Sequence, residues 1–159
     1  SAAIIAKDGK VERWDLGPLQ SAIQADLIPV IHGDVIFDSL RGGTILSTED
    51  LFSHLAVQLY PGRMLLAGIE PGVWQDFPSR TTIIPKISPQ NFQELMPVIG
   101  GSAATDVTGG MLDKVKQCVA LSQELPGMEI LIFSADEAGI LLEVLLGKSH
   151  GTVISGIED

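Results

Sequence analysis

The chain has 159 residues, of which 45% are hydrophobic and 19% are charged, so it is long enough and apolar enough to bury a core. Its 20 acidic and 10 basic residues give a net charge of −10, and no two basic residues are adjacent, which argues against a nucleic-acid-binding surface. No apolar run reaches membrane-helix length, the opening Ser1–Ala6 has no basic region of a signal peptide, and the single cysteine, Cys118, excludes an internal disulfide. We expect a cytoplasmic α/β protein that binds neither membranes nor nucleic acid.

The first elements predicted are a hairpin, a helix and a buried strand. Ala2–Ala6 and Val11–Trp14 flank an Asp-Gly turn, which is typical of hairpin arms. Pro18 suits the first turn of a helix that runs to about Asp26. The apolar run Ile28–Ile31 then has the pattern of a buried strand. Since the chain opens directly in a strand, we expect it to resemble a piece cut from a longer fold.

A second hairpin and a strong helix follow. Val35–Phe37 and Thr44–Leu46 read as its two arms. Ser47 or Thr48 can cap a helix whose apolar stripe includes leucines at 51, 55 and 59. Pro61-Gly62 ends that helix.

The remaining chain predicts further strands and helices in alternation. Residues 70–80 are rich in Pro and Gly and predict a long loop, and Gly100–Gly110 predicts a small-residue loop. The expected strands are Met64–Ala67, Glu129–Phe133 and Thr152–Ser155, and the expected helices are Asn91–Met96, Met111–Leu125 and Glu137–Leu146. This order predicts a single domain over residues 1–159, with a mostly parallel sheet covered by helices on both faces.

Three segments fall where ligands collect in such sheets, at strand ends and helix N-termini. His32-Gly33-Asp34 follows a predicted strand, where a glycine lets the backbone approach a ligand and its amide can hold a phosphate oxygen; a simple turn is the alternative. Ser47–Asp50 opens a helix, where a carboxylate could orient a cation, or merely cap the helix.

The third segment is Asp106–Lys114, with the sequence Asp-Val-Thr-Gly-Gly-Met-Leu-Asp-Lys. Gly109 and Gly110 before a helix suit a phosphate cradle, and Lys114 lies about one turn further on, where an ammonium can neutralise a transferring phosphoryl group. A glycine-rich helix entry with a surface lysine is the alternative. The spacing is not that of a P-loop.

Other chemistries find little support. The histidines at 32, 54 and 150 are scattered and, with one cysteine, give no metal-ligand spacing, so no protein metal site is predicted. Cys118 suits a small core residue. No nucleophile elbow or Ser-His-Asp set indicates a hydrolase.

Taken together, these segments resemble the C-terminal part of the amino acid kinase superfamily, and most closely its isopentenyl phosphate kinases. The matching stretches are Ile28–Asp38, Gly43–Leu51, Asp106–Lys114 and Gly151–Ile154, of which Thr-Gly-Gly-Met-x-x-Lys is the most specific. The resemblance runs over almost the whole chain. It implies a three-layer α/β/α sandwich and an ATP-dependent phosphotransferase that uses Mg²⁺.

The resemblance also implies roles for individual residues. Gly33 would present its amide to a small-molecule phosphate acceptor, with Asp34 beside it, and Asp50 would hold catalytic lysines in place. Gly109, Gly110 and Lys114 would bind the ATP phosphates, and Gly72 and Trp74 lie in the run that aligns with the adenine-side loop. Asp50 and Lys114 are therefore the catalytic candidates.

Two departures from the family pattern stand out. The adenine-side run is Gly68-Ile-Glu-Pro-Gly-Val-Trp74, in which Ile69 and Pro71 replace two aspartates and Trp74 replaces a tyrosine. The family's opening Lys-x-Gly-Gly-Ser loop and its substrate-pocket histidine are absent from this sequence. We therefore expect this chain alone to be inactive, and to need a complementary N-terminal portion or chain.

Three alternatives stay open at this point. The acceptor could be isopentenyl phosphate, which would place the protein in isoprenoid biosynthesis, or another small molecule such as an amino acid carboxylate, a nucleoside monophosphate or a phosphonate. The chain could instead be a non-catalytic nucleotide-binding or interaction module. Exposed strand edges left by a missing N-terminal portion also predict a homo-oligomer.

Overall fold

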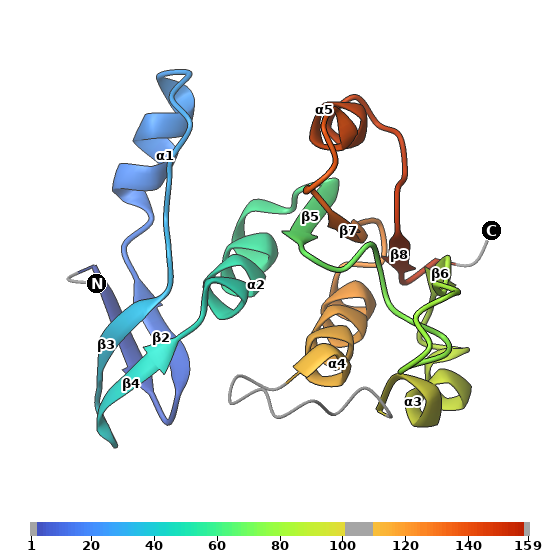
Figure 1. Ribbon diagram of the computed structural model, residues 1–159. Helices are drawn as coiled ribbons and strands as arrows, with labels where there is room; N and C mark the ends of the chain where they lie inside the picture. Colours follow the sequence, from blue (N-terminus) through green and yellow to red (C-terminus); the bar gives the residue numbers. More distant parts are fainter. Residues whose placement is uncertain (1–2, 101–109, 158–159) are drawn as a thin grey trace. The chain divides into compact units, whose positions relative to one another are not determined.

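The computed structural model describes residues 3–100 and 110–157 (Figure 1). The chain divides into two compact units, Ser1–Leu59 and Tyr60–Asp159, which are described separately below. The prediction of a single domain stays a prediction. Among the described residues, no helix has both the length and the apolar character needed to cross a membrane.

The first unit contains a four-stranded sheet made of two hairpins, and both predicted hairpins are confirmed. The strands are β1 (Ile4–Lys7), β2 (Lys10–Trp14), β3 (Asp34–Asp38) and β4 (Gly42–Leu46), in the spatial order β2-β1-β3-β4. β1–β2 and β3–β4 are antiparallel, and the two hairpins join through the parallel pair β1–β3.

Period-two alternation gives this sheet one buried face. Ile4, Ala6, Ile36 and Leu46 are buried on it and pack against Leu51 of α2 (Thr48–Leu59), with Val11 and Trp14 at the margin. Helix α2 ends as predicted, because Tyr60 takes a positive φ of 51° just before Pro61. His54 stacks on Trp14 at a centroid distance of 6.0 Å, and burial lowers its pKa, so it is a packing residue of this core.

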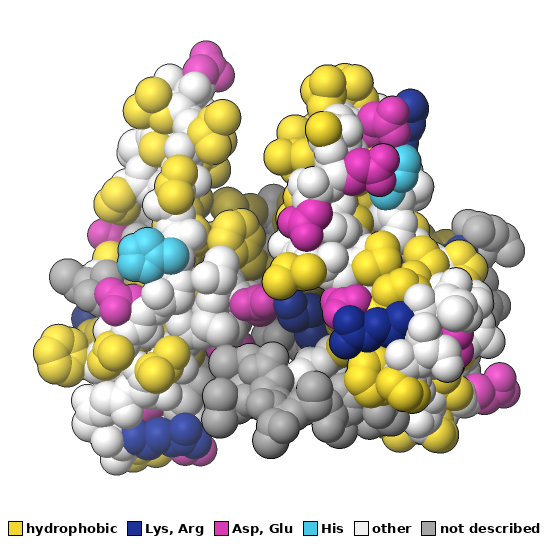
Figure 2. Space-filling model, viewed as in Figure 1, with side chains coloured by type: hydrophobic (Ala, Val, Ile, Leu, Met, Phe, Trp, Pro, Cys, Tyr) yellow, Lys and Arg dark blue, Asp and Glu magenta, His cyan; other side chains and the backbone are white. Residues whose placement is uncertain are grey.

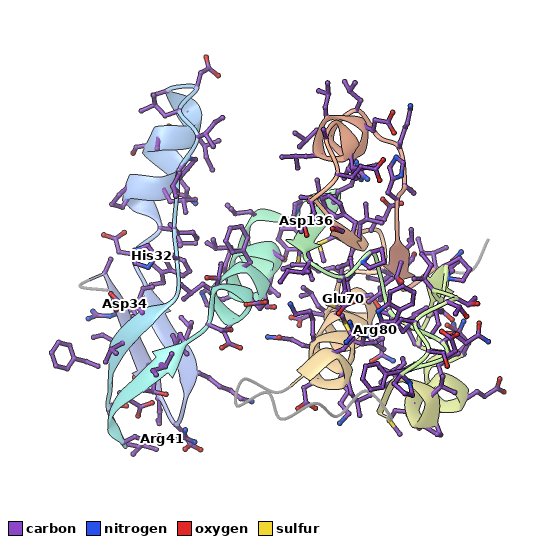
Figure 3. All side chains as sticks on the ribbon, in the orientation of Figure 1. His32, Asp34, Arg41, Glu70, Arg80 and Asp136 are labelled. Atoms are coloured by element: carbon purple, nitrogen blue, oxygen red, sulfur yellow. The ribbon has the colours of Figure 1, made fainter. Side chains whose placement is uncertain are left out.

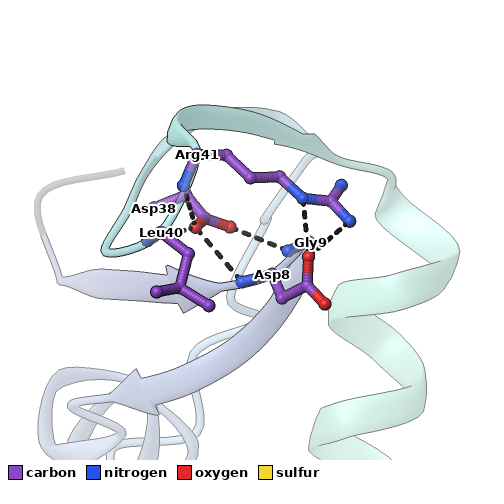
Figure 4. A network of polar contacts seen from close by, with 5 residues as sticks. All are labelled: Asp8, Gly9, Asp38, Leu40 and Arg41. Atoms are coloured by element: carbon purple, nitrogen blue, oxygen red, sulfur yellow. Dashed lines mark hydrogen bonds and ion pairs between the residues drawn. The ribbon is translucent and has the colours of Figure 1, made fainter.

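One buried carboxylate ties the turns of both hairpins together (Figure 4). The Asp38 side chain accepts hydrogen bonds from the backbone N–H groups of Asp8, Gly9, Leu40 and Arg41, at 3.1, 2.7, 2.9 and 2.9 Å. Burial on its own would raise the pKa of Asp38, but the four N–H donors outweigh it and lower that pKa to about 2. Arg41 also pairs with Asp8 at 2.7 Å across the same two turns.

The predicted buried strand Ile28–Ile31 is wrong for this structure. α1 (Gly17–Gln24) is followed by a turn at residues 25–26, and residues 27–33 belong to no strand. Ile28 and Val30 are exposed, and α1 itself has no buried residue. The apolar pattern therefore marks a segment that this unit leaves unburied.

The second unit contains a four-stranded mixed sheet. Its strands are β5 (Arg63–Gly68), β6 (Lys86–Ile87), β7 (Glu129–Ser134) and β8 (Thr152–Ser155), in the order β5-β7-β8-β6. β5–β7 and β6–β8 are parallel, whereas β7–β8 is antiparallel. The expected α/β class is confirmed, but the pairing over the two sheets is mixed rather than mostly parallel, because tight hairpins impose antiparallel pairs in the first unit and β8 runs back along β7.

Helices cover both faces of this second sheet. α5 (Ile140–Leu145) places Val144 and Ile140 against Leu131 and Phe133 of β7. The alternate β7 residues point to the other face, where α4 (Gly110–Glu124) packs on β7 and β8 with Val115 buried (Figure 1). α3 (Phe92–Gly100) packs on α4. The unit is thus layered helix–sheet–helix.

Some element boundaries differ from the predictions. α5 begins later than expected because Gly139 has a φ of 94°, which interrupts helical backbone before it. α3 extends beyond Met96, through Pro97. The two-residue β6 was not predicted. The expected loop Gly100–Gly110 lies mostly outside the described residues.

We predict that Asp38→Asn destabilises the first unit, because a neutral amide cannot replace a carboxylate that accepts four N–H donors. The pKa of Asp38 lies below its ordinary value of 3.8, so the stabilisation is present above about pH 4 and is lost as the pH falls towards about 2. Thermal unfolding, followed by Trp14 fluorescence in a Trp74→Phe background, should show a midpoint lowered by several degrees at pH 7 and little difference near pH 2.

The matched control is Asp26→Asn, since the Asp26 side chain is exposed and makes no polar contact among the described residues. It should leave the midpoint nearly unchanged. Equal midpoints for wild type and Asp38→Asn at pH 7 would contradict the assignment.

Candidate functional site

Gly33 is held against the start of α2. Its N–H donates to Thr48 Oγ1 at 3.0 Å. A Cβ at position 33 would lie 2.6 Å from the Leu46 carbonyl oxygen and 2.8 Å from the Thr48 nitrogen, so only glycine fits this approach. The amide that the sequence predicts as a ligand for the phosphate acceptor thus has an internal partner in this structure. Asp34 is exposed and accepts a hydrogen bond from the Val35 N–H at 2.7 Å (Figure 3).

Asp50 closes a reciprocal cap on the same helix. The Asp50 N–H donates to Ser47 Oγ at 3.0 Å, while the Ser47 N–H and Oγ donate to Asp50 Oδ2 at 2.9 and 2.8 Å. This is a capping box, with a carboxylate at the positive end of the helix. The helix-capping interpretation of Ser47–Asp50 is therefore confirmed, and a further role for Asp50 stays a prediction.

Ser47 and Thr48 make different contacts at the start of α2. Ser47 caps α2, and Thr48 accepts the hydrogen bond from Gly33. The structure therefore brings Gly33, Asp34 and Asp50, predicted from separate motifs, to one place at the start of α2. An anionic ligand there would meet two carboxylates, so it would need cations from elsewhere to bind.

In the second unit, two hydrogen bonds of the Thr152 side chain hold the loop that follows β5 in place. The buried Thr152 Oγ1 accepts from the Val73 N–H at 2.8 Å and donates to the Ile84 carbonyl at 2.7 Å. A Cβ on Gly72 would lie 2.8 Å from that hydroxyl oxygen, which explains the glycine. Backbone contacts between Trp74 and Ile83 close the loop, so residues 70–80, predicted to lack regular structure, are nevertheless tied down.

A polar cluster fixes Trp74 in this loop. Its indole N–H donates to Glu70 Oε2 at 2.6 Å, and Arg80 pairs with Glu70 Oε1 at 3.2 Å (Figure 3). Arg80 also lies over the Phe77 ring at 5.2 Å. Glu70, noted in the sequence only as a departure from the family pattern, thus orients the Trp74 ring.

Lys114 lies in the first turns of α4, half-buried, on the helix that Gly110 opens with a positive φ of 60°. Gly109 and Asp106 lie outside the described residues. The structure therefore places Lys114 and Gly110 on one helix end, as the spacing predicts.

Several polar residues of these units escaped the sequence reasoning. Thr152 was missed because its partners lie 68 and 79 residues away in the chain. Asp76 accepts from the Thr81 hydroxyl and from the Thr81 and Thr82 N–H groups, which together lower its pKa. The only signal in the sequence for this role is that Asp76 is an aspartate in a stretch rich in turn-forming residues.

Among the described residues, no group of three or more His, Cys, Asp or Glu side chains could hold a metal ion. Asp34 and Asp50 stand at the start of α2 with internal partners.

Comparison with known protein families identifies the class of protein to which this chain belongs. The model of the amino acid kinase family matches residues 1–134. The chain belongs to the amino acid kinase family.

Within that family the chain is isopentenyl phosphate kinase-like. It is 30% identical over 159 residues to the isopentenyl phosphate kinase of Methanothermobacter thermautotrophicus, covering 98% of this chain and 59% of the relative. It is 36% identical over 156 residues to that of Haloferax volcanii, covering 98% of this chain and 57% of the relative. The acetylglutamate kinase of Porphyra purpurea is 26% identical over 147 residues, with 92% and 49% covered. This chain thus spans between about half and three fifths of the length of these relatives.

Solved structures agree on the fold. X-ray structures of isopentenyl phosphate kinase align with a TM-score of 0.76 and 25% identity, covering 98% of this chain and 57% of that one. N-acetylglutamate synthase from Neisseria gonorrhoeae aligns with a TM-score of 0.65 at 19% identity, a likeness of fold alone. The expected amino acid kinase fold is confirmed.

We predict that Gly33→Ala destabilises the first unit by about 1–3 kcal/mol, because the new methyl group would overlap backbone atoms of Leu46 and Thr48. Gly43→Ala is the control in the same sheet, since its Cβ would meet only the Ile36 carbonyl oxygen at 3.9 Å. Urea unfolding measures both. Equal free energies of unfolding for the two variants would contradict the tight junction at Gly33.

Proposed function

We propose that this chain supplies the ATP-side part of a small-molecule kinase that resembles isopentenyl phosphate kinase. The reaction would be isopentenyl phosphate plus ATP giving isopentenyl diphosphate plus ADP. The observation that carries the proposal is the alignment of isopentenyl phosphate kinases from two organisms over 98% of this chain, at 30% and 36% identity. The positions of Asp50 and Lys114 at two helix starts support it.

Lys114 is proposed to neutralise charge on the transferred phosphate. Phosphoryl transfer depends on positioning and charge neutralisation more than on a strong base. In a chain with a net charge of −10, a cation at the start of a helix is a marked local exception. The α4 N-terminus, with Gly109 and Gly110, adds N–H groups and the positive end of the helix dipole towards the same phosphates.

The start of α2 is proposed as one wall of the acceptor site. Gly33 would exchange its internal hydrogen bond to Thr48 for one to the acceptor, with Asp34 beside it. Asp50, already fixed by Ser47, would orient cationic side chains from the part of the family fold that this chain does not cover.

Trp74 is proposed as the surface on which the adenine ring lies, with Gly72 permitting close approach of the loop. Glu70 and Arg80 support this by holding the indole in one orientation. Mg²⁺ is proposed to arrive with ATP and to be held mainly by the phosphate oxygens of the nucleotide.

The remaining part of the fold is proposed to be essential for activity. The chain covers only 57–59% of its isopentenyl phosphate kinase relatives. It lacks the Lys-x-Gly-Gly-Ser loop and the pocket histidine of the resemblance. We therefore propose that this chain alone transfers no phosphate and requires a complementary N-terminal portion. Homo-oligomerisation and a cytoplasmic location also stay predictions.

Other acceptors define the second candidate function. The similarity to acetylglutamate kinase favours a carboxylate acceptor as the first alternative to isopentenyl phosphate. A panel of acceptors offered to the complemented protein separates these possibilities. The panel contains isopentenyl phosphate, N-acetylglutamate, nucleoside monophosphates and a phosphonate.

The third candidate function is a non-catalytic nucleotide-binding module, which would bind ATP but phosphorylate nothing in the panel. The replacement of two aspartates by Ile69 and Pro71 favours it.

We predict that saturating Mg-ATP raises the unfolding temperature of the wild-type chain by several degrees, since ligand at 100 times Kd stabilises by about 2.7 kcal/mol. Lys114→Ala should lose most of this shift. Lys116→Ala, two residues along the same helix, removes only an exposed pair with Asp113 and should keep it. An undiminished shift in Lys114→Ala, or no shift in the wild type, would contradict the proposed nucleotide site.

A further inference from the structure

One carboxylate on α5 holds the turn that joins this helix to β8. The Glu143 side chain contacts His150 Nε2 at 2.7 Å and Lys148 Nζ at 3.0 Å. Since a charged carboxylate only accepts hydrogen bonds, the histidine N–H is the donor. Lys148 and His150 lower the pKa of Glu143, which keeps this acceptor charged at neutral pH. In Figure 2, acidic, basic and histidine side chains lie together beside α5 at the top of the second unit.

Glu143 projects from a helical turn that is itself fixed to the sheet. The next residue, Val144, is fully buried against β7. The Val144 carbonyl also accepts a hydrogen bond from Arg63 Nη1 of β5 at 2.8 Å. The carboxylate of Glu143 is therefore a fixed point to which the turn before β8 is attached.

His150 directly precedes the residues that hold the loop after β5. Gly151 has a φ of 97°, and a Cβ on it would lie 2.5 Å from the Pro71 carbonyl oxygen and closer still to a carbonyl oxygen of β7. The backbone at Gly151 is thus wedged between the loop and the sheet. Thr152 follows at once, and its hydroxyl accepts the Val73 N–H at 2.8 Å. A displacement of His150 would therefore be passed directly to the loop.

We propose that Glu143 and His150 are positioning residues for the base side of the nucleotide site. They fix the start of β8 and, through Thr152, the loop that presents Trp74. Lys148 contacts the same carboxylate but does not adjoin the residues that touch the loop, so the His150 contact carries the effect. The inference rests on the proposed nucleotide site and deepens it, because the loop is then held from a helix that does not contact the nucleotide.

Hydrogen exchange tests the coupling without any ligand. In His150→Ala, the Val73 amide should exchange at least about tenfold faster than in the wild-type chain, because its acceptor Thr152 is less firmly held. His150→Gln should restore slow exchange, since a glutamine amide can still donate to Glu143. The amides of β5 and β7 should exchange at wild-type rates in both variants, which would show that the change is local.

Calorimetric titration then tests the consequence for the nucleotide. His150→Ala should raise the Kd for Mg-ATP about fivefold, the size of effect expected from one lost hydrogen bond. The Kd for magnesium tripolyphosphate, which carries no base, should stay unchanged. Lys148→Ala is the matched control, because it removes the other partner of Glu143, and it should alter neither Kd nor the Val73 exchange rate.

Four results would overturn the inference. They are unchanged Val73 exchange in His150→Ala, no rescue by His150→Gln, an equal effect of Lys148→Ala, and equal weakening of Mg-ATP and tripolyphosphate binding. A wild-type chain that binds no Mg-ATP would instead contradict the proposed nucleotide site. The exchange rate of Val73 would still decide whether Glu143 and His150 position the loop.

Discussion

The hydrogen bond from Gly33 to Thr48 fixes the junction on which the first unit depends. It brings the end of an extended segment onto the first turn of α2, at a distance that excludes any side chain at position 33. The neighbouring Ser47–Asp50 cap fixes the same turn from the other side. Together they set where β3 starts, where α2 points and where the exposed segment before them emerges.

The sheet of this unit shows a second constraint of the same kind. Asp38 joins the turns of two hairpins through four backbone donors, so neither turn can move without the other. A carboxylate can do this because it accepts several N–H groups at once, whereas a neutral side chain cannot. In this unit such polar contacts accompany a small core that includes Ile36, Leu46 and Leu51.

Local patterns predicted much of the fold. The Asp-Gly turn and the alternating arms gave both hairpins, and Ser47 with Asp50 marked the start of α2. The prediction of a strand at Ile28–Ile31 was wrong for a physical reason: its residues have the character of a buried strand, but none of the described strands β1–β4 of this unit pairs with them. The antiparallel pairing of β7 and β8 could not be predicted from the sequence either, because strand direction within a sheet is set by contacts between residues far apart in the chain.

Some residues of the candidate site could likewise be predicted from local sequence, whereas others could not. Motifs predicted roles for Gly33, Asp50, Gly110 and Lys114, and the structure places each of them at or against a helix start. Thr152 holds the loop that contains Gly72 and Trp74. Its role could not be predicted from the sequence, because its hydrogen-bond partners are distant in the chain. Glu70 carried a signal only as a departure from the family pattern, and its contact with the indole gives that departure a structural role.

The most direct measurement of the central claim is ³¹P NMR of Mg-ATP and isopentenyl phosphate with the chain alone, and with the chain in a verified complex with the N-terminal portion of a relative. We predict that isopentenyl diphosphate and ADP form only with the complex, and that Lys114→Ala in the complex slows their formation by at least about 100-fold. Transfer by the pure chain alone, or no transfer to isopentenyl phosphate by a complex that binds Mg-ATP, would contradict the proposed function.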